Sequence, residues 1–257
     1  MITTVIFDWA GTTIDFGSVA PVSAFREAFR QYGIEVSEEE TRAPMGMLKI
    51  DHIRTMLAAP ELAARFEAAK GRRPDESDAQ AIYASFEPAQ MAVLTQHCDL
   101  KPGLIGCVKA LRAKGIRIGT TTGFTREMMS VVAPEAERFG YKPDLVVTAE
   151  DADGRGRPYP YMIFENMRRL GEVDVCRVLK VGDTVSDIEE ARASGVWAAA
   201  VLEGSSVMGL TRAEWDALSE AGREAARAKA RAVFEAAGAQ FILRNLDEVP
   251  ILAGMIA

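Results

Sequence analysis

Short runs of β-branched and apolar residues alternate with helix-length segments along most of this chain. Six runs have the length and composition of strands: Thr4–Phe7, Ile116–Thr121, Leu145–Thr148, Val178–Val181, Val196–Leu202 and Phe241–Leu243. Most are separated by segments long enough for a helix, namely Gly103–Lys114, Thr125–Arg138, Tyr159–Leu170 and Ser186–Ala193. Strands that alternate with helices pair in parallel through right-handed crossovers. The pattern therefore predicts an α/β core domain with a doubly wound, Rossmann-like parallel sheet.

One long interval breaks this alternation. Between the first and second predicted strands the sequence has several amphipathic stretches and no convincing strand. The helix signals there are a proline at the start of Pro21–Tyr32, the capping-box pattern Ser37-x-x-Glu40 and the long run Asp78–Gln96. We therefore predict an inserted α-helical cap domain, residues 18–99, within a core domain of residues 1–17 and 100–257. The expected hinge segments are Phe16–Val19 and Leu100–Gly103.

The overall charge of the chain makes some partners unfavourable. The 257 residues include 30 Lys and Arg against 37 Asp and Glu, for a net charge of −7. Such a chain repels phosphate backbones and anionic membranes unless it carries a basic patch, and the sequence has no basic run. We expect neither nucleic acid nor a membrane as a partner. A small anionic substrate still fits, because a pocket can be positive within a negative protein.

Cysteine usage and the N-terminal sequence bear on the compartment. The three cysteines, Cys98, Cys107 and Cys176, have no CxxC spacing, which argues against a disulfide framework or a zinc site. The first residues lack the basic start and apolar stretch of a secretory signal. No segment approaches the roughly 18 apolar residues of a membrane-spanning helix. We therefore expect a cytoplasmic protein.

The alanine-rich segment Thr211–Ala237 predicts one long surface helix.

Polar residues follow three of the predicted strands. Asp8 comes after the first strand, Thr122-Gly123 after the second and Asp183 after a later one. Ligands of open parallel sheets bind beyond the carboxyl ends of the strands. Asp8 and Asp183 would then face one crevice and repel each other unless a cation lies between them. Mg²⁺, which binds one or two carboxylates together with substrate oxygens and water, is the expected cofactor.

The same edge offers groups for a phosphoryl ligand. They are the N–H groups and hydroxyls of Gly11, Thr12, Thr122 and Gly123, and the fixed positive charge of Arg157. Each signal alone is common, because an Asp after a strand is usually a turn residue and a loop Arg is usually solvated. The ordered set on three strands is much more specific.

These ordered motifs resemble the haloacid dehalogenase superfamily of phosphoryl-transfer enzymes, and the resemblance covers essentially the whole chain. It implies that Asp8 is the nucleophile that becomes an aspartyl-phosphate. The implied metal ligands are Asp8, the backbone carbonyl of Ala10, and Asp183, with Asp187 supporting them. Phosphatases of this superfamily carry a second Asp two residues after the nucleophile as a general acid, and this chain has Ala10 there.

The cap sequence narrows the resemblance. Three stretches resemble the phosphonoacetaldehyde hydrolase (phosphonatase) family: Pro44-Met45-Gly46-Met47-Leu48-Lys49-Ile50-Asp51-His52, Asp8-Trp-Ala10-Gly11-Thr12-Thr13 and Gly156-Arg157-Pro158-Tyr159-Pro160. The resemblance implies that Lys49 forms a Schiff base with the aldehyde of the substrate, in the degradation of 2-aminoethylphosphonate. It also implies a homodimer formed through the cap domains. Phe124 stands where we expect a tyrosine in the family.

The chemistry of a carbon–phosphorus bond agrees with this interpretation. Direct cleavage would expel a carbanion, a very poor leaving group. If Lys49 first condenses with the neighbouring carbonyl, the iminium accepts the electrons and an enamine forms. No alkoxide leaves, so the acid that Ala10 replaces is unnecessary. Lys49 must be partly neutral to attack, so we expect its pKa to be lowered by burial or by a nearby cation.

Two residues near Lys49 are candidates for its support. His52, three positions later, would share its face in a helix and could move protons during imine formation. Met45, four positions earlier, would lie on the same side and shield the amine from water. Outside such a motif, a helical Lys is usually solvated and a Met usually packs in a core. His97 has no partner in the sequence and is interpreted as structural.

The sequence leaves two alternative functions open. One is a phosphatase or phosphomutase of the same superfamily that acts on a phosphate ester; Ala10 argues against it, and substrate profiling would separate the two. The other is a catalytically silent member that binds a phosphorylated ligand, which the intact Asp8, Lys49 and Asp183 disfavour. The sequence does not identify the group that activates water for hydrolysis of the aspartyl-phosphate.

Overall fold

A single parallel sheet forms the centre of the molecule. The computed structural model describes residues 1–256. Its strands are β1 (Thr4–Phe7), β2 (Arg117–Thr121), β3 (Leu145–Val147), β4 (Val178–Gly182), β5 (Trp197–Val201) and β6 (Phe241–Leu243). They pair in the order β3-β2-β1-β4-β5-β6, and every pair is parallel. The predicted strands and the doubly wound α/β class are confirmed.

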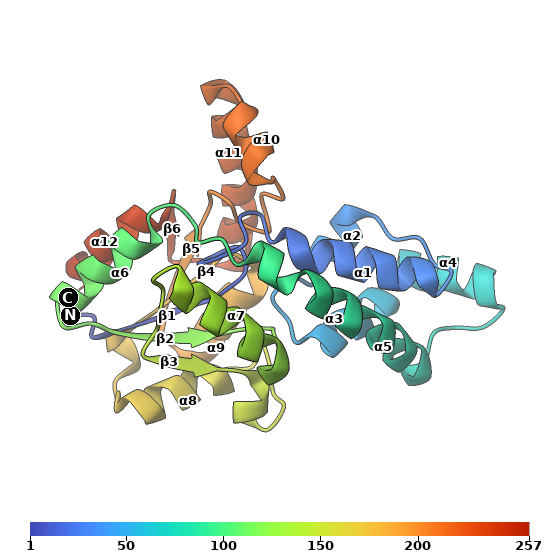
Figure 1. The fold of residues 1–257 in the computed structure, drawn as a ribbon, viewed down its shortest axis with the longest axis horizontal. Coiled ribbons are helices and arrows are strands. Elements are labelled where there is room, and N and C mark those ends of the chain that lie inside the picture. The colour runs from blue at the N-terminus through green and yellow to red at the C-terminus, as the bar shows by residue number, and fades with distance from the viewer. Residues whose placement is uncertain (257) are drawn as a thin grey trace.

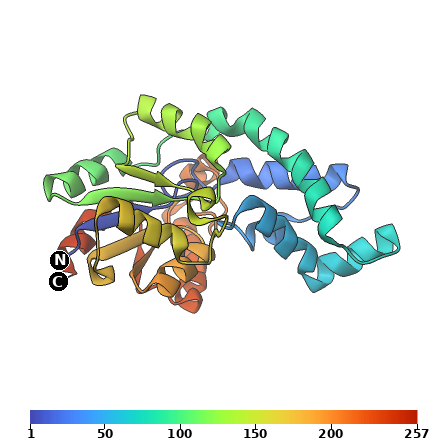
Figure 2. The same ribbon diagram turned by 90° about the horizontal axis from the view of Figure 1, so that it is seen from below.

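Helices cover both faces of this sheet (Figures 1 and 2). On one face lie α6 (Leu104–Ala113), α7 (Arg126–Arg138) and α12 (Val249–Met255); on the other lie α8 (Tyr161–Leu170), α9 (Val185–Ser194) and α11 (Glu220–Ala237). Because side chains alternate along a strand, Ile6 packs against the α8 and α9 side while its neighbour Phe7 packs against the opposite side. Both side chains are fully buried.

Five consecutive helices follow β1 and lie beyond one end of the sheet (Figure 1). They are α1 (Val19–Gln31), α2 (Glu38–Arg42), α3 (Lys49–Ala58), α4 (Pro60–Lys70) and α5 (Glu76–Val93), and we call them the helical insert. Phe25 of α1 stacks on Phe86 of α5, with ring centroids 4.1 Å apart, and on His52 of α3 at 3.9 Å. This aromatic stack ties three of the five helices together.

Short 3-10 turns lie between several of these helices and strands. The short 3-10 turns are η1 (Leu94–His97), η2 (Ala149–Ala152), η3 (Val175–Arg177) and η4 (Leu246–Glu248). The predicted long helix Asp78–Gln96 is therefore α5 followed by η1. The capping box is confirmed: the Ser37 hydroxyl accepts from the N–H of Glu40, and the Glu40 carboxylate accepts from the N–H of Ser37.

Two helix predictions are wrong in detail. Helix α1 begins at Val19, so Pro21 is its third residue; the first turn tolerates proline there because those N–H groups have no intrahelical acceptor. Residues 211–237 form two helices, α10 (Arg212–Ala217) and α11, rather than one. The backbone is extended at Leu218, and the Ser219 side chain caps the next helix by accepting from the N–H of Gly222.

No helix within residues 1–256 has both the length and the apolar composition needed to cross a bilayer.

We expect Phe25→Ala to lower the free energy of unfolding by about 3–5 kcal/mol, because it removes a fully buried ring from the stack and leaves a cavity. Urea unfolding followed by circular dichroism measures this. The control is Phe139→Ala, whose side chain is half exposed and which should change stability little. Equal effects of the two substitutions would contradict the packing described here.

Candidate active site

The carboxyl end of the sheet and the helical insert border a small cavity. The part of the chain that forms the sheet and its covering helices contributes Asp8, Ala10, Thr122, Gly123, Phe124, Arg157 and Thr184 to its lining. From the insert and its first junction come Ser18, Met45, Gly46 and Lys49. The sequence predictions for Asp8, Lys49 and Arg157 therefore converge on one space.

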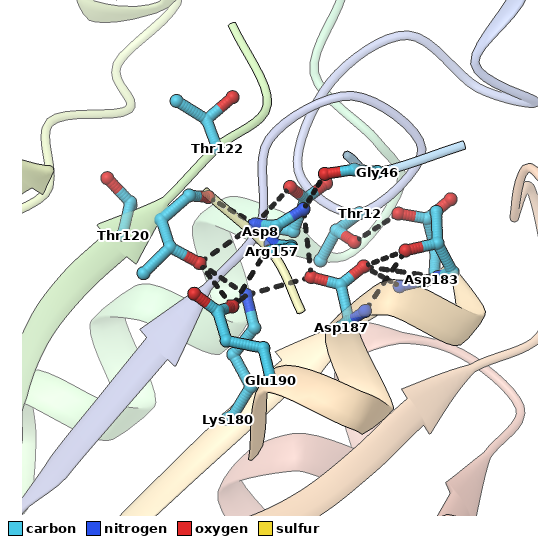
Figure 3. A network of polar contacts seen from close by, with 12 residues as sticks. Asp8, Thr12, Gly46, Thr120, Thr122, Arg157, Lys180, Asp183, Asp187 and Glu190 are labelled. Atoms are coloured by element: carbon cyan, nitrogen blue, oxygen red, sulfur yellow. Dashed lines mark hydrogen bonds and ion pairs between the residues drawn. The ribbon is translucent and has the colours of Figure 1, made fainter. Parts of the chain in front are cut away.

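Arg157 is the central charge of the site (Figure 3). Its side chain is fully buried, and Nη2 lies 2.7 Å from Oδ1 of Asp8. Burial raises the pKa of Asp8, and the Arg157 guanidinium opposes this rise. Nη1 of the same group lies 3.1 Å from Oδ1 of Asp187. Arg157 thus holds the predicted nucleophile in place as well as offering positive charge.

Three buried carboxylates lie together beside Arg157. Oxygens of Asp8, Asp183 and Asp187 all fall within 4.8 Å of one another. Burial, and then the charges of Asp8 and Asp187, raise the pKa of Asp183 well above its usual value. Like charges held this close in a buried site are costly unless a cation joins them. Oxygen-only ligands suit a hard divalent ion, so the arrangement fits a metal site.

Neighbouring groups fix these carboxylates. For Asp183, the Thr12 hydroxyl donates to Oδ1 and the N–H of Ser206 to Oδ2, each at 2.7 Å. Asp187 accepts from the Thr184 hydroxyl at 2.6 Å. Burial would raise the pKa of Asp187, but Arg157 and Lys180 lower it to about 2. Asp187 is therefore the carboxylate of the three that stays ionised most readily.

The hydrogen bonds of Gly11 and Thr12 differ from the predicted role of these residues, which was to bind a phosphoryl group. The N–H of Gly11 donates to the carbonyl of Ile14 at 2.8 Å, and that of Thr12 to the carbonyl of Trp9 at 3.1 Å. Neither residue lines the cavity. Both N–H groups are used within the loop because it turns back on itself directly after β1. In this structure Thr12 orients Asp183, and no N–H of the pair is free for a phosphoryl group.

Lys49 begins helix α3 and points its amine into the cavity from the insert side. The side chain is only 3% exposed. Nζ lies 5.0 Å from the ring centre of Phe124 and 5.8 Å from that of Phe25. Burial lowers the pKa of Lys49 to about 8, with Arg157 adding to the effect and Asp8 opposing it. The lowered pKa expected from the sequence is therefore present.

His52 lies one helical turn after Lys49 but does not line the cavity. Its Nε2 lies 2.9 Å from the carbonyl oxygen of Thr41, so that nitrogen carries the proton. Nδ1 then carries the lone pair, and within residues 1–256 it has no hydrogen-bond partner. Burial and the charge of Lys49 lower the pKa of His52 well below its usual value. His52 is thus a neutral imidazole. Met45 is buried and lines the cavity, but it precedes α3 and so does not share a helical face with Lys49.

Two glycines allow the insert and the core to meet at the cavity. A Cβ on Gly123 would overlap the carbonyl oxygen of Met47 in the insert. A Cβ on Gly46, whose φ is +93°, would overlap the hydroxyl of Thr184 in the core. Any side chain at either position would push the two parts apart. Thr122, beside Gly123, also lines the cavity, and its hydroxyl accepts from the N–H of Phe124 at 3.0 Å.

Some residues of the site were not found from the sequence. Lys180 in β4 and Glu190 in α9 are fully buried beneath Arg157, and Ser18 lines the cavity with a left-handed backbone. A lysine inside the predicted strand Val178–Val181 was the available signal, because a charged residue is almost never fully buried without a partner. His97 also has a partner: Nδ1 lies 3.4 Å from Oδ1 of Asp15 at the first junction.

Comparison with known proteins agrees with this geometry. The haloacid dehalogenase-like hydrolase family matches residues 2–195. A phosphonoacetaldehyde hydrolase from Lysinibacillus sphaericus is 45% identical over 255 residues, covering 99% of this chain and 95% of that protein. The chain belongs to the phosphonoacetaldehyde hydrolase family. It is therefore a hydrolase, as the sequence motifs predict.

Two further similar proteins extend the comparison. A crystal structure described as a phosphonoacetaldehyde hydrolase-like protein from Oleispira antarctica matches with a TM-score of 0.95 at 37% identity, covering 99% of this chain and 92% of that one. A bifunctional phosphonoacetaldehyde hydrolase/aminoethylphosphonate transaminase from Clostridioides difficile is 41% identical over 245 residues, 95% of this chain and 38% of that protein. The fold and the family thus agree.

We expect Lys49→Met to stabilise the folded chain by about 1–3 kcal/mol at pH 7, because it removes a buried charge. The folded pKa of about 8 lies below that of an exposed lysine, 10.5, so the unfolded state binds the proton more tightly. The penalty is complete below pH 8 and disappears above pH 10.5. The stability gain, measured by urea unfolding, should shrink markedly from pH 7 to pH 9.5. A gain that does not change with pH would contradict the buried charged amine.

Proposed function

We propose that this chain hydrolyses phosphonoacetaldehyde to acetaldehyde and phosphate. The observation that carries the proposal is that the amine of Lys49 and the carboxylate of Asp8 face one small cavity, with Arg157 beside them. An amine suits a carbonyl carbon and a carboxylate suits phosphorus, and the substrate carries both centres two bonds apart. The names of the relatives support this choice of substrate.

The first step is imine formation. Nζ of Lys49 attacks the aldehyde carbon and water leaves, which gives an iminium. A pKa of about 8 keeps a useful fraction of the amine neutral near pH 7, and the Phe25 and Phe124 rings exclude water around it. The proposed part of His52 is to move protons in this step through its unpartnered Nδ1, with Met45 helping to keep the amine dry.

The second step transfers phosphorus to Asp8. A carboxylate oxygen attacks phosphorus in line, the carbon–phosphorus bond breaks, and its electron pair forms the enamine on Lys49. Arg157 and Thr122 bind the phosphoryl oxygens, with Gly123 allowing their close approach. No alkoxide forms, so Ala10 in place of a general acid does not impede the step.

Two hydrolyses complete the cycle. Water attacks phosphorus of the aspartyl-phosphate and releases phosphate and free Asp8. The enamine takes a proton on carbon and becomes an iminium, which a second water hydrolyses to acetaldehyde and free Lys49. Imine formation releases one water, so one water is consumed overall. In this account the insert is a cap, residues 18–99, that closes over the core at the junctions on either side of it.

Mg²⁺ is the proposed metal. Asp8, the Ala10 carbonyl and Asp183 would hold it, with Asp187 beside them, because the buried acidic cluster needs a hard divalent cation. When bound there, it would offset negative charge on the phosphoryl oxygens.

The wider setting follows from the chemistry of the substrate. A transaminase converts the amine of aminoethylphosphonate into an aldehyde, which is phosphonoacetaldehyde, and one relative is named for both activities. We therefore place this chain in 2-aminoethylphosphonate degradation. The three free cysteines, two of them buried, support a reducing compartment such as the cytoplasm. We also propose a homodimer through the caps, on the family resemblance.

Mg²⁺ should raise the unfolding temperature of the native chain, because it relieves repulsion among the buried carboxylates. At a concentration about 100 times its Kd, the gain should be about 2.7 kcal/mol. Asp183→Asn should be more stable than the native chain without metal and should gain little from Mg²⁺. Differential scanning calorimetry measures both. An equal gain in the variant would place the ion elsewhere.

Lys49→Arg keeps the positive charge but is a poor imine former, so we expect no detectable acetaldehyde from phosphonoacetaldehyde with Mg²⁺. The control is Lys109→Arg, an exposed lysine of α6, which should turn over like the native chain. Acetaldehyde is followed with a coupled alcohol dehydrogenase.

Turnover by Lys49→Arg at the native rate would reject the Schiff base. No acetaldehyde from the native chain would reject the substrate, and a panel of phosphate esters would then test the phosphatase or phosphomutase alternative.

A further inference from the structure

A buried polar cluster lies directly beneath the guanidinium of Arg157 (Figure 3). It consists of Thr121 at the end of β2, Lys180 in β4 and Glu190 in α9, and we call it the support cluster. All three residues are fully buried and none lines the cavity. None of them has a part in the chemistry proposed above.

The Thr121 hydroxyl joins the members of the support cluster. It donates to Oε2 of Glu190 at 3.0 Å and accepts from Nζ of Lys180 at 2.8 Å. It also accepts from Nη2 of Arg157 at 2.8 Å. Lys180 further pairs with Oδ1 of Asp187 at 2.9 Å and approaches Oε2 of Glu190 at 3.5 Å. The cluster therefore touches Arg157 and one carboxylate of the acidic group.

The orientation of Arg157 follows from these contacts. Nε donates to Oε2 of Glu190 at 3.0 Å, and Nη2 donates to the carbonyl of Thr121 at 2.7 Å. The remaining edge of the guanidinium then faces Asp8 and Asp187. A guanidinium is planar, so fixing Nε on one side sets the direction of Nη2 on the other.

Glu190 is poorly explained as a stabilising ion pair. Its Oε2 takes every contact with Arg157, Thr121 and Lys180, while its buried Oε1 has no partner among the residues that the structure describes. A buried carboxylate with an unsatisfied oxygen is costly, and buried ion pairs often contribute little net stability. The contacts that the Glu190 carboxylate does make serve to orient Arg157.

We propose that Glu190 and Lys180 are positioning residues. Together with Thr121, they hold the Arg157 guanidinium in the orientation that faces Asp8 for phosphorus transfer. The inference rests on the proposed function for its kinetic part. Lys180 has a charge opposite to that of Glu190, so the pair fixes Arg157 without adding net negative charge beneath a site that binds an anion. Loss of Glu190 lets the guanidinium rotate away from in-line geometry.

The kinetic test compares two halves of the reaction. Glu190→Gln should lower kcat for phosphonoacetaldehyde roughly 10- to 100-fold, the range typical of lost supporting contacts, with little change in KM. Imine formation, measured by borohydride trapping of acetaldehyde on Lys49, should match the native chain, because Lys49 approaches from the insert. Glu189→Gln makes the same change at an exposed position of the same helix and should behave as the native chain.

A second readout needs no turnover. The Nε–H of Arg157 should give a slowly exchanging ¹⁵N–¹H signal, identified by its absence in Arg157→Lys. Glu190→Gln should speed its exchange, and Glu189→Gln should not. If Glu190→Gln does not fold, Thr121→Val, which keeps the side-chain shape but removes the bridging hydroxyl, should show the same kinetic split.

Native kcat in folded Glu190→Gln, an unchanged Nε–H signal, or an equal fall in kcat and imine trapping would each overturn the proposal. An inactive native chain with the expected Nε–H change would reject the proposed substrate and leave the positioning of Arg157 supported.

Discussion

The arrangement of the site depends on one buried guanidinium, that of Arg157, which pairs with several carboxylates at once. Arg157 contacts Asp8, Asp187 and Glu190 within an interior where isolated charges are costly. Because its donors lie in one plane, the acceptors must come from fixed directions, and β1 and α9 supply them at the carboxyl edge of the sheet. Burial and the charges of Asp8 and Asp187 raise the pKa of Asp183, and a divalent cation bound at this edge would relieve that repulsion. The strand order, the burial of these charges and the fit of a metal ion therefore all depend on the same arrangement of Arg157 and the carboxylates.

The insert brings the second reactive group to the same place. Under the proposed function, Asp8 and Arg157 of the core would act on phosphorus, but no core lysine within residues 1–256 lines the cavity to reach a carbonyl carbon. Lys49 reaches the cavity because the loop before α3 lies against the core, where Gly46 and Gly123 leave room for close contact. That contact also buries the amine, which lowers its pKa. Docking of the insert thus completes the cavity, and under the proposed function the same burial activates the lysine.

The sequence predicts the parts of this molecule better than their contacts. Alternating strands and helices indicate the sheet, and polar residues after the strands indicate Asp8, Asp183 and Thr122, because those patterns depend on local sequence. The break at Leu218 is less visible, since a single serine cap inside an alanine-rich run carries a weak signal. The roles of Thr12, Lys180 and Glu190 depend on contacts between residues far apart in the chain. The motif that makes Gly11 and Thr12 resemble phosphate ligands does not reveal that the loop uses their N–H groups itself.

The central claim is that Lys49 and Asp8 act in turn on one substrate in one cavity. It is tested most directly by mass spectrometry of the Asp8→Asn chain after treatment with phosphonoacetaldehyde and borohydride. This account predicts a reduced adduct on Lys49 that still carries phosphorus, because the imine forms and its carbon–phosphorus bond cannot then be broken. The native chain under the same treatment should carry the two-carbon group without phosphorus. An adduct on another lysine, or loss of phosphorus from the Asp8→Asn adduct, would contradict the account.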